Sequence, residues 1–404
     1  MENKKKPAIR FKGFCDDWEQ RKLPEFVSFF NGLTYTPDDV QETGTLVLRS
    51  SNVKNGEIVD ADNVYVSDKV VTSENVQEGD IIVVVRNGSR ALIGKHAQIK
   101  ASMPNTVIGA FMSGIRSGHS SFINALLDTS AFENEIAKNM GATINQITGY
   151  MFSKMEFMIP SEEEQQRIGE YFSNLDHLIT LHQRKCNKLQ LIKKSMLEKM
   201  FPQNSQNIPE VRFKGFTDAW EQRKVAEIGN IITGSTPKTS ISDNYGGEFL
   251  FVSPADIQGN RYVDETITTL TKKGFDQGRK IRERASLFVS IGSTIGKVAQ
   301  TSQESTTNQQ INAVEPYDNF DDDFIFTSLE NISGSIKAIA TNQAVPIVNK
   351  TTFGETEIQV PSELAEQQRI GAYFRNLDHL ITLHQRELEK LQIIKKSMLE
   401  KMFV

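Results

Sequence analysis

The sequence predicts an α+β protein in which two globular α/β domains of one fold are separated by two long antiparallel helices that form a coiled coil. Two internal repeats support this prediction. Residues Glu164–Phe201 recur as Glu366–Phe403, and 32 of these 38 aligned positions are identical. Residues Arg10–Lys22 (RFKGFCDDWEQRK) return as Arg212–Lys224 (RFKGFTDAWEQRK). The offset is 202 residues in both cases, so the chain is a tandem duplication with an internal pseudo-twofold relation.

The repeats also set the expected domain boundaries. We place the first globular domain at residues 1–160, the first helix at 161–202, the second globular domain at 203–361 and the second helix at 362–404. The globular segments diverge while the repeats stay almost unchanged. This pattern suggests one scaffold that carries two different recognition surfaces.

Composition agrees with this organisation. A chain of 404 residues is long enough for two or three domains with cores of their own. No apolar run reaches the length of a signal peptide or a membrane span. Cys15 and Cys186 match neither disulfide nor zinc spacing, which favours a reduced, cytoplasmic setting. The net charge of −5 is not the basic balance expected of a free-standing nucleic-acid-binding domain, so basic residues must cluster or partners must contact phosphate.

The repeated segment itself predicts a long helix. Ser161 is the expected N-cap, with Glu164 completing a capping box, and Phe201-Pro202 closes the helix. The second copy begins at Pro361-Ser362 and carries Ala365 at the box position, so its cap is weaker. About 39 helical residues make a rod of roughly 58 Å, which needs a packing partner.

An apolar stripe at alternating steps of four and three residues runs along each helix. The stripe and the histidines on it are the expected helix-pair and subunit interface: Ile168, Phe172, Leu175, Ile179, His182, Leu189, Met196, Ile370, Phe374, Leu377, Ile381, His384, Leu391 and Met398. Residues expected to be exposed also match between the copies, namely His177, Thr180, Gln183, Lys193, Lys194 and Lys199. Either both helices meet identical partners, or the duplication is recent.

Short β-branched or aromatic runs bounded by turn residues predict strands in both globular segments. These runs are residues 44–49, 80–85, 249–252 and 286–290, and residues 122–140 and 323–332 are expected to be helical. Gly94-Lys95 and Gly296-Lys297 correspond at the 202-residue offset, which indicates one shared fold.

The sequence predicts no catalytic, cofactor-binding or metal-binding residues in this chain. Gly292 to Gly296 encloses three residues and Gly88 to Gly94 encloses five, whereas a Walker A loop encloses four. These loops are better interpreted as bringing backbone and a lysine close to an anion. His177 and His182 are five residues apart and do not form an i,i+4 metal pair.

Residues suited to nucleic acid gather on loops of both domains. Arg and Lys pair with guanine or phosphate, and Asn and Gln pair with adenine. In the first domain the candidates are Arg86, Asn87, Ser89, Arg90, Lys95, Asn105 and Thr106. In the second they are Lys272, Lys273, Arg279, Lys280, Arg282, Ser293, Thr294, Lys297, Asn308, Gln309 and Gln310, with Arg284 in the same basic run. Asn105-Thr106 is expected to occupy the position of Asn308 to Gln310.

These features resemble the specificity (S) subunit of a type I restriction-modification system. The opening RFKGF…WEQRK, the helix leader EQQRIG..F..LD at Glu164–Asp176 and Glu366–Asp378, and GSTIGKVA…TNQQINAV at Gly292–Val314 are typical of that family. The first domain departs from the last pattern, with RNGSRALIGKHA and PNTVIGAF.

The resemblance implies non-catalytic recognition of double-stranded DNA by two target-recognition domains, each reading one half of a bipartite, asymmetric target across a fixed spacer. It implies two modification (methyltransferase) subunits as partners and, through them, two restriction subunits. S-adenosylmethionine, ATP and Mg would belong to those partners, and no membrane is involved. The alternatives are a coiled-coil scaffold that binds protein or RNA, and an enzyme with an unrecognised site.

Overall fold

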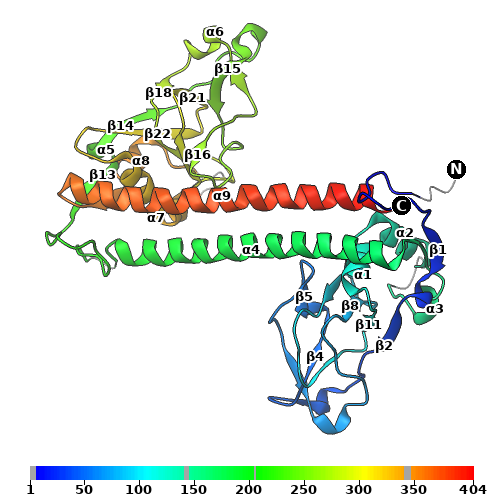
Figure 1. The fold of residues 1–404 in the computed structure, drawn as a ribbon. Helices are drawn as coiled ribbons and strands as arrows, with labels where there is room; N and C mark the ends of the chain where they lie inside the picture. Colours follow the sequence, from blue (N-terminus) through cyan, green and yellow to red (C-terminus); the bar gives the residue numbers. More distant parts are fainter. Residues whose placement is uncertain (1–5, 141–144, 204–205, 341–346) are drawn as a thin grey trace. The chain divides into compact units, whose positions relative to one another are not determined.

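The computed structural model describes residues 6–140, 145–203, 206–340 and 347–404 (Figure 1). The chain divides into two compact units, residues 1–181 with 388–404, and residues 182–387. Each unit therefore holds one globular domain, the first half of the long helix that follows it, and the last half of the other long helix. The predicted boundaries assigned each helix to one segment, whereas the compact units divide both helices.

The two long helices are α4, Glu162–Met200, and α9, Leu364–Met402, with 39 residues each. In unit 1, Phe172 near the start of α4 lies in the same apolar cluster as Met398 near the end of α9. In unit 2, Phe374 near the start of α9 clusters with Met196 near the end of α4. The helices therefore pair in an antiparallel sense within each unit, which confirms the predicted fold class.

Residues of the predicted stripe are among the most buried of the long helices. Ile168, Phe172, Ile370 and Phe374 are at most 2% exposed. His182 and His384 meet in unit 2, with their Nδ1 atoms 3.2 Å apart. Polar residues that meet within a largely apolar stripe help to define the register of the pair.

The two globular domains have related sheets. Central strands of one sheet in each domain are antiparallel, and each domain also has a parallel strand pair, β10 with β4 in the first and β21 with β15 in the second. In the first domain one sheet has the order β2 (Ser28–Asn31), β11 (Met112–Arg116), β8 (Ile81–Val84) and β9 (His96–Gln98). Its other sheet has the order β10 (Thr106–Ile108), β4 (Thr45–Leu48), β7 (Val64–Val66) and β3 (Val40–Gln41). In the second domain one sheet has the order β14 (Gly229–Thr233), β22 (Ile311–Pro316), β19 (Ser286–Val289), β20 (Val298–Thr301) and β16 (Tyr262–Val263). Its other sheet has the order β17 (Thr269–Leu270), β15 (Tyr245–Val252), β21 (Ser305–Thr307) and β18 (Lys280–Ile281).

The helix expected at residues 122–140 is two helices, α1 (Ser120–Leu127) and α2 (Ser130–Asn139). Thr129 divides them, because its hydroxyl accepts a hydrogen bond from the Phe132 backbone N–H and caps α2. In the second domain the corresponding helix α7, Asp322–Ala340, is continuous and longer than the predicted 323–332.

The residue after each long helix completes the core of the other domain's unit. Phe403, just beyond α9, lies 6.1 Å from Trp18 and 5.6 Å from Phe122 between ring centroids. Phe201, just beyond α4, lies 5.7 Å from both Trp220 and Phe324. Each unit thus depends on an aromatic side chain from the other repeat.

The opening repeat fixes the start of each long helix. Arg10 Nε and Nη2 donate to the two carboxylate oxygens of Glu164 at 2.6 and 2.7 Å, and Trp18 Nε1 donates to the same carboxylate at 3.1 Å. Arg212 binds Glu366 with the same two distances. The capping box expected at Glu164 is therefore wrong, since a basic side chain far away in sequence takes both carboxylate oxygens.

Across the described ranges, no helix has the length and apolar character needed to cross a bilayer. In the same ranges no three His, Cys, Asp or Glu side chains come together as metal ligands would. Both Cys15 and Cys186 are free thiols.

Candidate nucleic-acid interface

Three turns of the second domain meet beside the start of β22. They are residues 233–236 after β14, 290–297 between β19 and β20, and 308–310 between β21 and β22. The Ser290 N–H donates to the Gln310 carbonyl at 2.8 Å, and the Ser235 N–H donates to the Thr307 carbonyl at 2.9 Å. The structure thus brings the predicted amide residues and the predicted glycine-rich loop together.

Polar side chains of these three turns form hydrogen bonds with one another at the surface. Thr236 donates its hydroxyl proton to Gln309 Oε1 at 2.5 Å, and Asn308 Nδ2 donates to Gln310 Oε1 at 3.0 Å. Gln309 itself is exposed. Gly234 allows the close approach of these turns, because a Cβ there would lie 2.1 Å from the Asn308 carbonyl oxygen. The result is a set of ordered amides of the kind that reads adenine edges.

Arg279 joins this group, whereas three other predicted cations form a separate cluster. Arg279 Nη1 donates to the Thr233 carbonyl at 2.8 Å. Lys272 and Lys280 share Asp276 at 3.0 and 2.9 Å, and Lys273 faces Asp243 at 3.5 Å. These lysine pairs are exposed and worth little to stability, so the lysines can exchange their carboxylate partners for phosphate.

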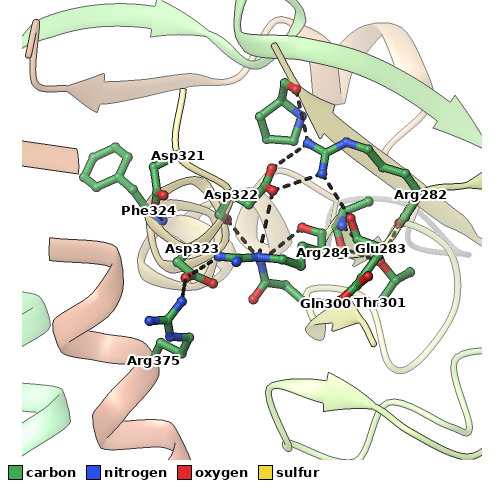
Figure 2. Close-up of polar contacts among 12 residues, drawn as sticks. Arg282, Glu283, Arg284, Gln300, Thr301, Asp321, Asp322, Asp323, Phe324 and Arg375 are labelled. Carbon is green, nitrogen blue, oxygen red and sulfur yellow. Dashed lines mark hydrogen bonds and ion pairs between the residues drawn. The ribbon is translucent and has the colours of Figure 1, made fainter. Parts of the chain in front are cut away.

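Arg282 and Arg284 are committed to internal ion pairs (Figure 2). Arg282 contacts both oxygens of Asp322, at 2.5 and 2.9 Å, and Arg284 contacts Asp323 at 2.5 Å. Asp323 also binds Arg375 of α9 at 2.8 Å. Asp323 thus links Arg284 to the long helix. The carboxylate partners of these two arginines are 20% and 2% exposed, whereas Asp276 and Asp243, which pair with the lysines, are 47% and 73% exposed.

The glycine-rich loops have a structural explanation that the sequence did not show. Gly296 adopts φ +91°, and a Cβ there would lie 3.3 Å from Lys337 Cβ of α7. Gly94 adopts φ +86° and faces Ile136 of α2 in the same way. Lys297 donates to the Ile257 carbonyl at 2.8 Å, and Ser293 and Thr294 lie in the turn before it. Close packing of the glycine against a helix occurs in both domains, and in the second domain the lysine that follows is held by a backbone carbonyl.

In the first domain the predicted basic loop connects β8 to β9. Arg86, Ser89 and Arg90 are exposed, and Lys95 is half-buried. Asn87 Nδ2 donates to the Ser50 hydroxyl at 3.2 Å, which ties the loop to its neighbour. This loop therefore presents two exposed arginines and an exposed hydroxyl to a ligand.

Strand register identifies the first-domain counterpart of Gln310. Met112 pairs with Val84 in the first domain, as Ile311 pairs with Val289 in the second. The neighbouring pair also matches: the Val85 N–H donates to the Phe111 carbonyl at 3.0 Å, as the Ser290 N–H donates to the Gln310 carbonyl in the second domain. Phe111 therefore occupies the position of Gln310.

The expected match of Asn105-Thr106 with Asn308 to Gln310 is wrong. Thr106 begins β10 and is 2% exposed, which makes it a counterpart of the buried strand β21. Asn105 has φ +51°, and its amide accepts from Thr45 at 2.7 Å and donates to Asp68 at 3.2 Å. Divergence of the domains hid this register, since only the strand pairing reveals it.

Phe111 is the residue that sequence reasoning missed. Its side chain is 55% exposed, and the Arg86 guanidinium carbon lies 5.0 Å from its ring centroid. It borders a groove of about 730 Å³ that is also lined by Tyr35, Val40 and Arg49. An exposed aromatic ring that stacks with an arginine and borders a groove is a candidate contact surface. The available signal was the apolar run IGAF in place of the amides.

The matched residues of the long helices divide into two kinds. Thr180 donates to Glu57 at 2.9 Å, and Lys193 is paired with Asp378 and Glu330, so both serve internal contacts. The expectation that Lys193 is exposed is therefore wrong. Other matched positions are apolar and exposed to similar degrees: Leu178 (41%) with Leu380 (41%), Leu181 (38%) with Leu383 (44%), and Leu191 (68%) with Ile393 (69%).

Two divergent domains that present ordered polar and aromatic loops, on a duplicated helical frame, define a two-part recognition subunit. The family model of the type I restriction modification DNA specificity domain matches residues 15–191 and 217–392. The chain belongs to this family, which confirms the resemblance seen in the motifs.

Individual relatives agree with this assignment. The HindI specificity subunit of Haemophilus influenzae is 32% identical over 148 residues, 36% of this chain and 32% of that protein. The MjaIX specificity subunit of Methanocaldococcus jannaschii is 26% identical over 190 residues, 46% of this chain and 44% of that protein. The chain thus spans less than half of these two relatives. A putative MjaX specificity subunit of the same organism is 22% identical over 405 residues, 95% of this chain and 92% of that protein.

A solved structure shows the same fold. The S subunit of a type I restriction-modification system from M. genitalium superposes with a TM-score of 0.74 at 14% identity, covering 99% of each chain.

Proposed function

We propose that this chain is the DNA-reading subunit of a type I restriction-modification complex, and that each globular domain recognises one half of a bipartite target. The observation that carries the proposal is the register match between the 308–310 turn and the 109–111 turn. The same place in one fold holds Gln310 in one domain and Phe111 in the other. Surfaces that differ at equivalent positions suit two different half-site sequences.

The charge of this chain favours a complex in which the chain and its partner subunits bind duplex DNA jointly. The exposed cations of the candidate loops, Arg86 and Arg90 in the first domain and Lys272 and Lys273 in the second, are few for a chain of net charge −5. Phosphate contacts dominate affinity for DNA. We therefore infer that methyltransferase subunits supply part of the phosphate contact, and that specificity resides in this chain.

The duplicated helices suit two copies of one partner. Exposed apolar residues recur on α4 and α9 at equal exposure, so a protein that binds one set binds the other with the same chemistry. Methyl transfer and strand cleavage would then belong to the modification and restriction subunits, with S-adenosylmethionine, ATP and Mg bound there. This chain would direct those activities without an active site of its own.

The long helices would also set the unread spacer between the half-sites. Both are 39 residues long and continue from one compact unit into the other. A helix rises about 1.5 Å per residue, so its length is a fixed measure between its ends.

Domain replacement tests the proposal. Residues 227–360 are exchanged for the matching segment of another family member, and methylated adenines are mapped in cells that carry the complex. One half-site should change while the other half-site and the spacer stay the same. The reciprocal exchange of residues 25–159 should change the other half-site. A simultaneous change of both half-sites, or methyl transfer by the isolated chain, contradicts the proposal.

The same cells test the alternative of a scaffold unrelated to restriction. Deletion of the gene should abolish methylation at one split sequence. If the methylated positions are identical with and without the gene, the scaffold interpretation is favoured instead.

A further inference from the structure

Each unit contains a lysine held between two carboxylates from two other elements. In unit 1, Lys395 Nζ of α9 lies 2.5 Å from Asp176 of α4 and 2.7 Å from Asp128, the C-cap residue that follows α1. In unit 2, Lys193 Nζ of α4 lies 2.6 Å from both Asp378 of α9 and Glu330 of α7. We name these the unit 1 triad and the unit 2 triad.

The two triads are equivalent at all three positions. Lys193 and Lys395, Asp176 and Asp378, and Asp128 and Glu330 are each 202 residues apart. The first two pairs lie in the nearly identical helices. The third pair lies in the divergent globular domains, where an acid has been kept although the side chain differs in length.

The triads join each globular domain to the helix of the other repeat. Lys395 belongs to the second repeat, and it binds the first domain through Asp128. Lys193 belongs to the first repeat, and it binds the second domain through Glu330. The lysine side chains are 19% and 15% exposed, so each ammonium group lies mostly out of water.

Each triad has a further basic side chain beside one of its carboxylates. His96 Nε2 lies 3.4 Å from Asp128 in unit 1, and Arg261 lies 2.8 Å from Asp378 in unit 2. A mostly buried charge is costly without its partner, so a domain rotated on the helix pair would leave an unpaired charge at this junction. Such a contact specifies orientation more than it adds stability.

We propose that Lys193 and Lys395 are positioning residues that fix the angle at which each globular domain sits on its helix pair, and so fix the spacer between the half-sites. This inference rests on the proposed function. The affected quantity is the selectivity for spacer length, because a small rotation of one domain displaces its half-site along the duplex.

The test compares methylation rates on duplexes with the native spacer and with spacers one base pair shorter or longer. In unit 2 the variant is K193M/E330Q, which leaves Asp378 paired with Arg261. In unit 1 it is K395M/D128N/D176N, which leaves no carboxylate of the triad unpaired. Matched controls are K194M and K396M, because both lysines are exposed and have no ion pair among the described residues.

Each triad variant should lose about tenfold in selectivity for the native spacer, since the lost contacts are charge-assisted hydrogen bonds. Selectivity for the bases of both half-sites and the unfolding signals of Trp18 and Trp220 should stay as in the wild type. A purely structural role predicts that these well-folded variants, in which no buried charge is left unpaired, keep the wild-type spacer selectivity, and that result overturns the inference.

Two further outcomes are informative. If a triad variant does not fold, K193R and K395R retain the charge on a side chain of different shape, and they should give a smaller loss of spacer selectivity. Unchanged selectivity in folded arginine variants also overturns the inference. If the wild-type complex methylates no split target at all, the proposed function fails, and this inference fails with it.

Discussion

Arg10 and Glu164 are 154 residues apart and form a two-pronged ion pair, and Arg212 and Glu366 repeat it at the same separation. The Glu164 side chain is fully buried and that of Arg10 is 13% exposed. The opening segment of each half is therefore an integral part of the helix junction.

Loss of this arginine should destabilise one unit selectively. Arg10→Met leaves the buried Glu164 carboxylate without its cation, which should cost about 3 kcal/mol of unfolding free energy. Trp18 and Trp220 are the only tryptophans, one in each unit, so fluorescence in a Trp220→Phe background follows unit 1 alone. Arg21→Met is the control, because the exposed pair of Arg21 with Glu25 is worth less than about 1 kcal/mol. Equal effects of the two substitutions would contradict the prediction.

Unit 1 should lose stability as the pH rises above about 6.5, the ordinary pKa of histidine. Burial acts to lower the pKa of His96, but its hydrogen bond and charge interaction with Asp128 outweigh burial and raise that pKa. Burial acts to raise the pKa of Asp128, but its contacts with His96 and with Lys395 outweigh burial and lower that pKa to about 2. A group with a raised folded pKa stabilises most below its unfolded pKa, and that contribution disappears as pH rises through the folded pKa.

Urea unfolding of unit 1 between pH 6 and pH 8.5, followed by Trp18, measures this dependence. His96→Gln should remove the decline with pH, because glutamine does not titrate. The position of His96 is Val298 in the second half, so the Trp220 signal provides an internal comparison. A decline of the same size in the glutamine variant would exclude His96 as its cause.

Phe111 should contact a thymine methyl group in the first half-site. Replacing that thymine by deoxyuridine should weaken binding of the wild-type complex by about 1 kcal/mol, or roughly fivefold, the value of one buried methyl group. Phe111→Ala should bind both duplexes equally. Gln310→Ala is the control, because it lies in the other domain and should leave the thymine preference unchanged. Insensitivity of the wild type to every such replacement in the half-site would refute the contact.

Substitution on one long helix should remove one of two partner subunits. Leu178→Glu with Leu181→Glu should reduce the number of bound methyltransferase subunits from two to one, and adding Leu380→Glu with Leu383→Glu should reduce it to none. Mass measurement of the complex gives the number directly. Ile267, 81% exposed in the second domain, provides the control Ile267→Glu, which should leave two partners bound. Retention of both partners by the fourfold variant would place the partner surface elsewhere.

Lengthening both helices should lengthen the spacer. Seven helix-forming residues inserted between Leu181 and His182, and seven between Glu387 and Leu388, preserve the heptad phase and add about 10 Å. Base pairs stack about 3.4 Å apart, so the preferred spacer should grow by about three pairs. Methylated sites show the spacer directly. An unchanged spacer in an active insertion variant would show that the helices do not measure this distance.

Much of the fold followed from the sequence because the repeats are long and periodic. The apolar stripe through Phe172 and Phe374 predicted both helices and their antiparallel pairing. Local patterns failed where distant residues compete for a side chain. Glu164 reads as a capping residue, but Arg10 binds it from far along the chain.

The candidate interface was predictable only where residue type was informative. The amides Asn308, Gln309 and Gln310 were found, since their chemistry marks them. Phe111 was missed because an aromatic residue after a strand usually belongs to a core, and only the strand pairing shows that it replaces Gln310. Lys193 was taken for a surface residue, since no local pattern reveals a carboxylate contributed by Glu330.

The segment before each opening repeat contacts the end of a long helix in the same way in both halves. The Val211 N–H donates to the Lys199 carbonyl at 2.9 Å, where one half leads covalently into the next. The Ile9 N–H donates to the Lys401 carbonyl at the same distance, although no peptide bond joins those segments. Either junction can therefore be cut or sealed without altering its contacts. A circular permutant can have its new termini between Phe201 and Val211 and have Val404 linked to the segment before Ile9. It should adopt the same structure, with the two globular domains in the opposite order along the chain.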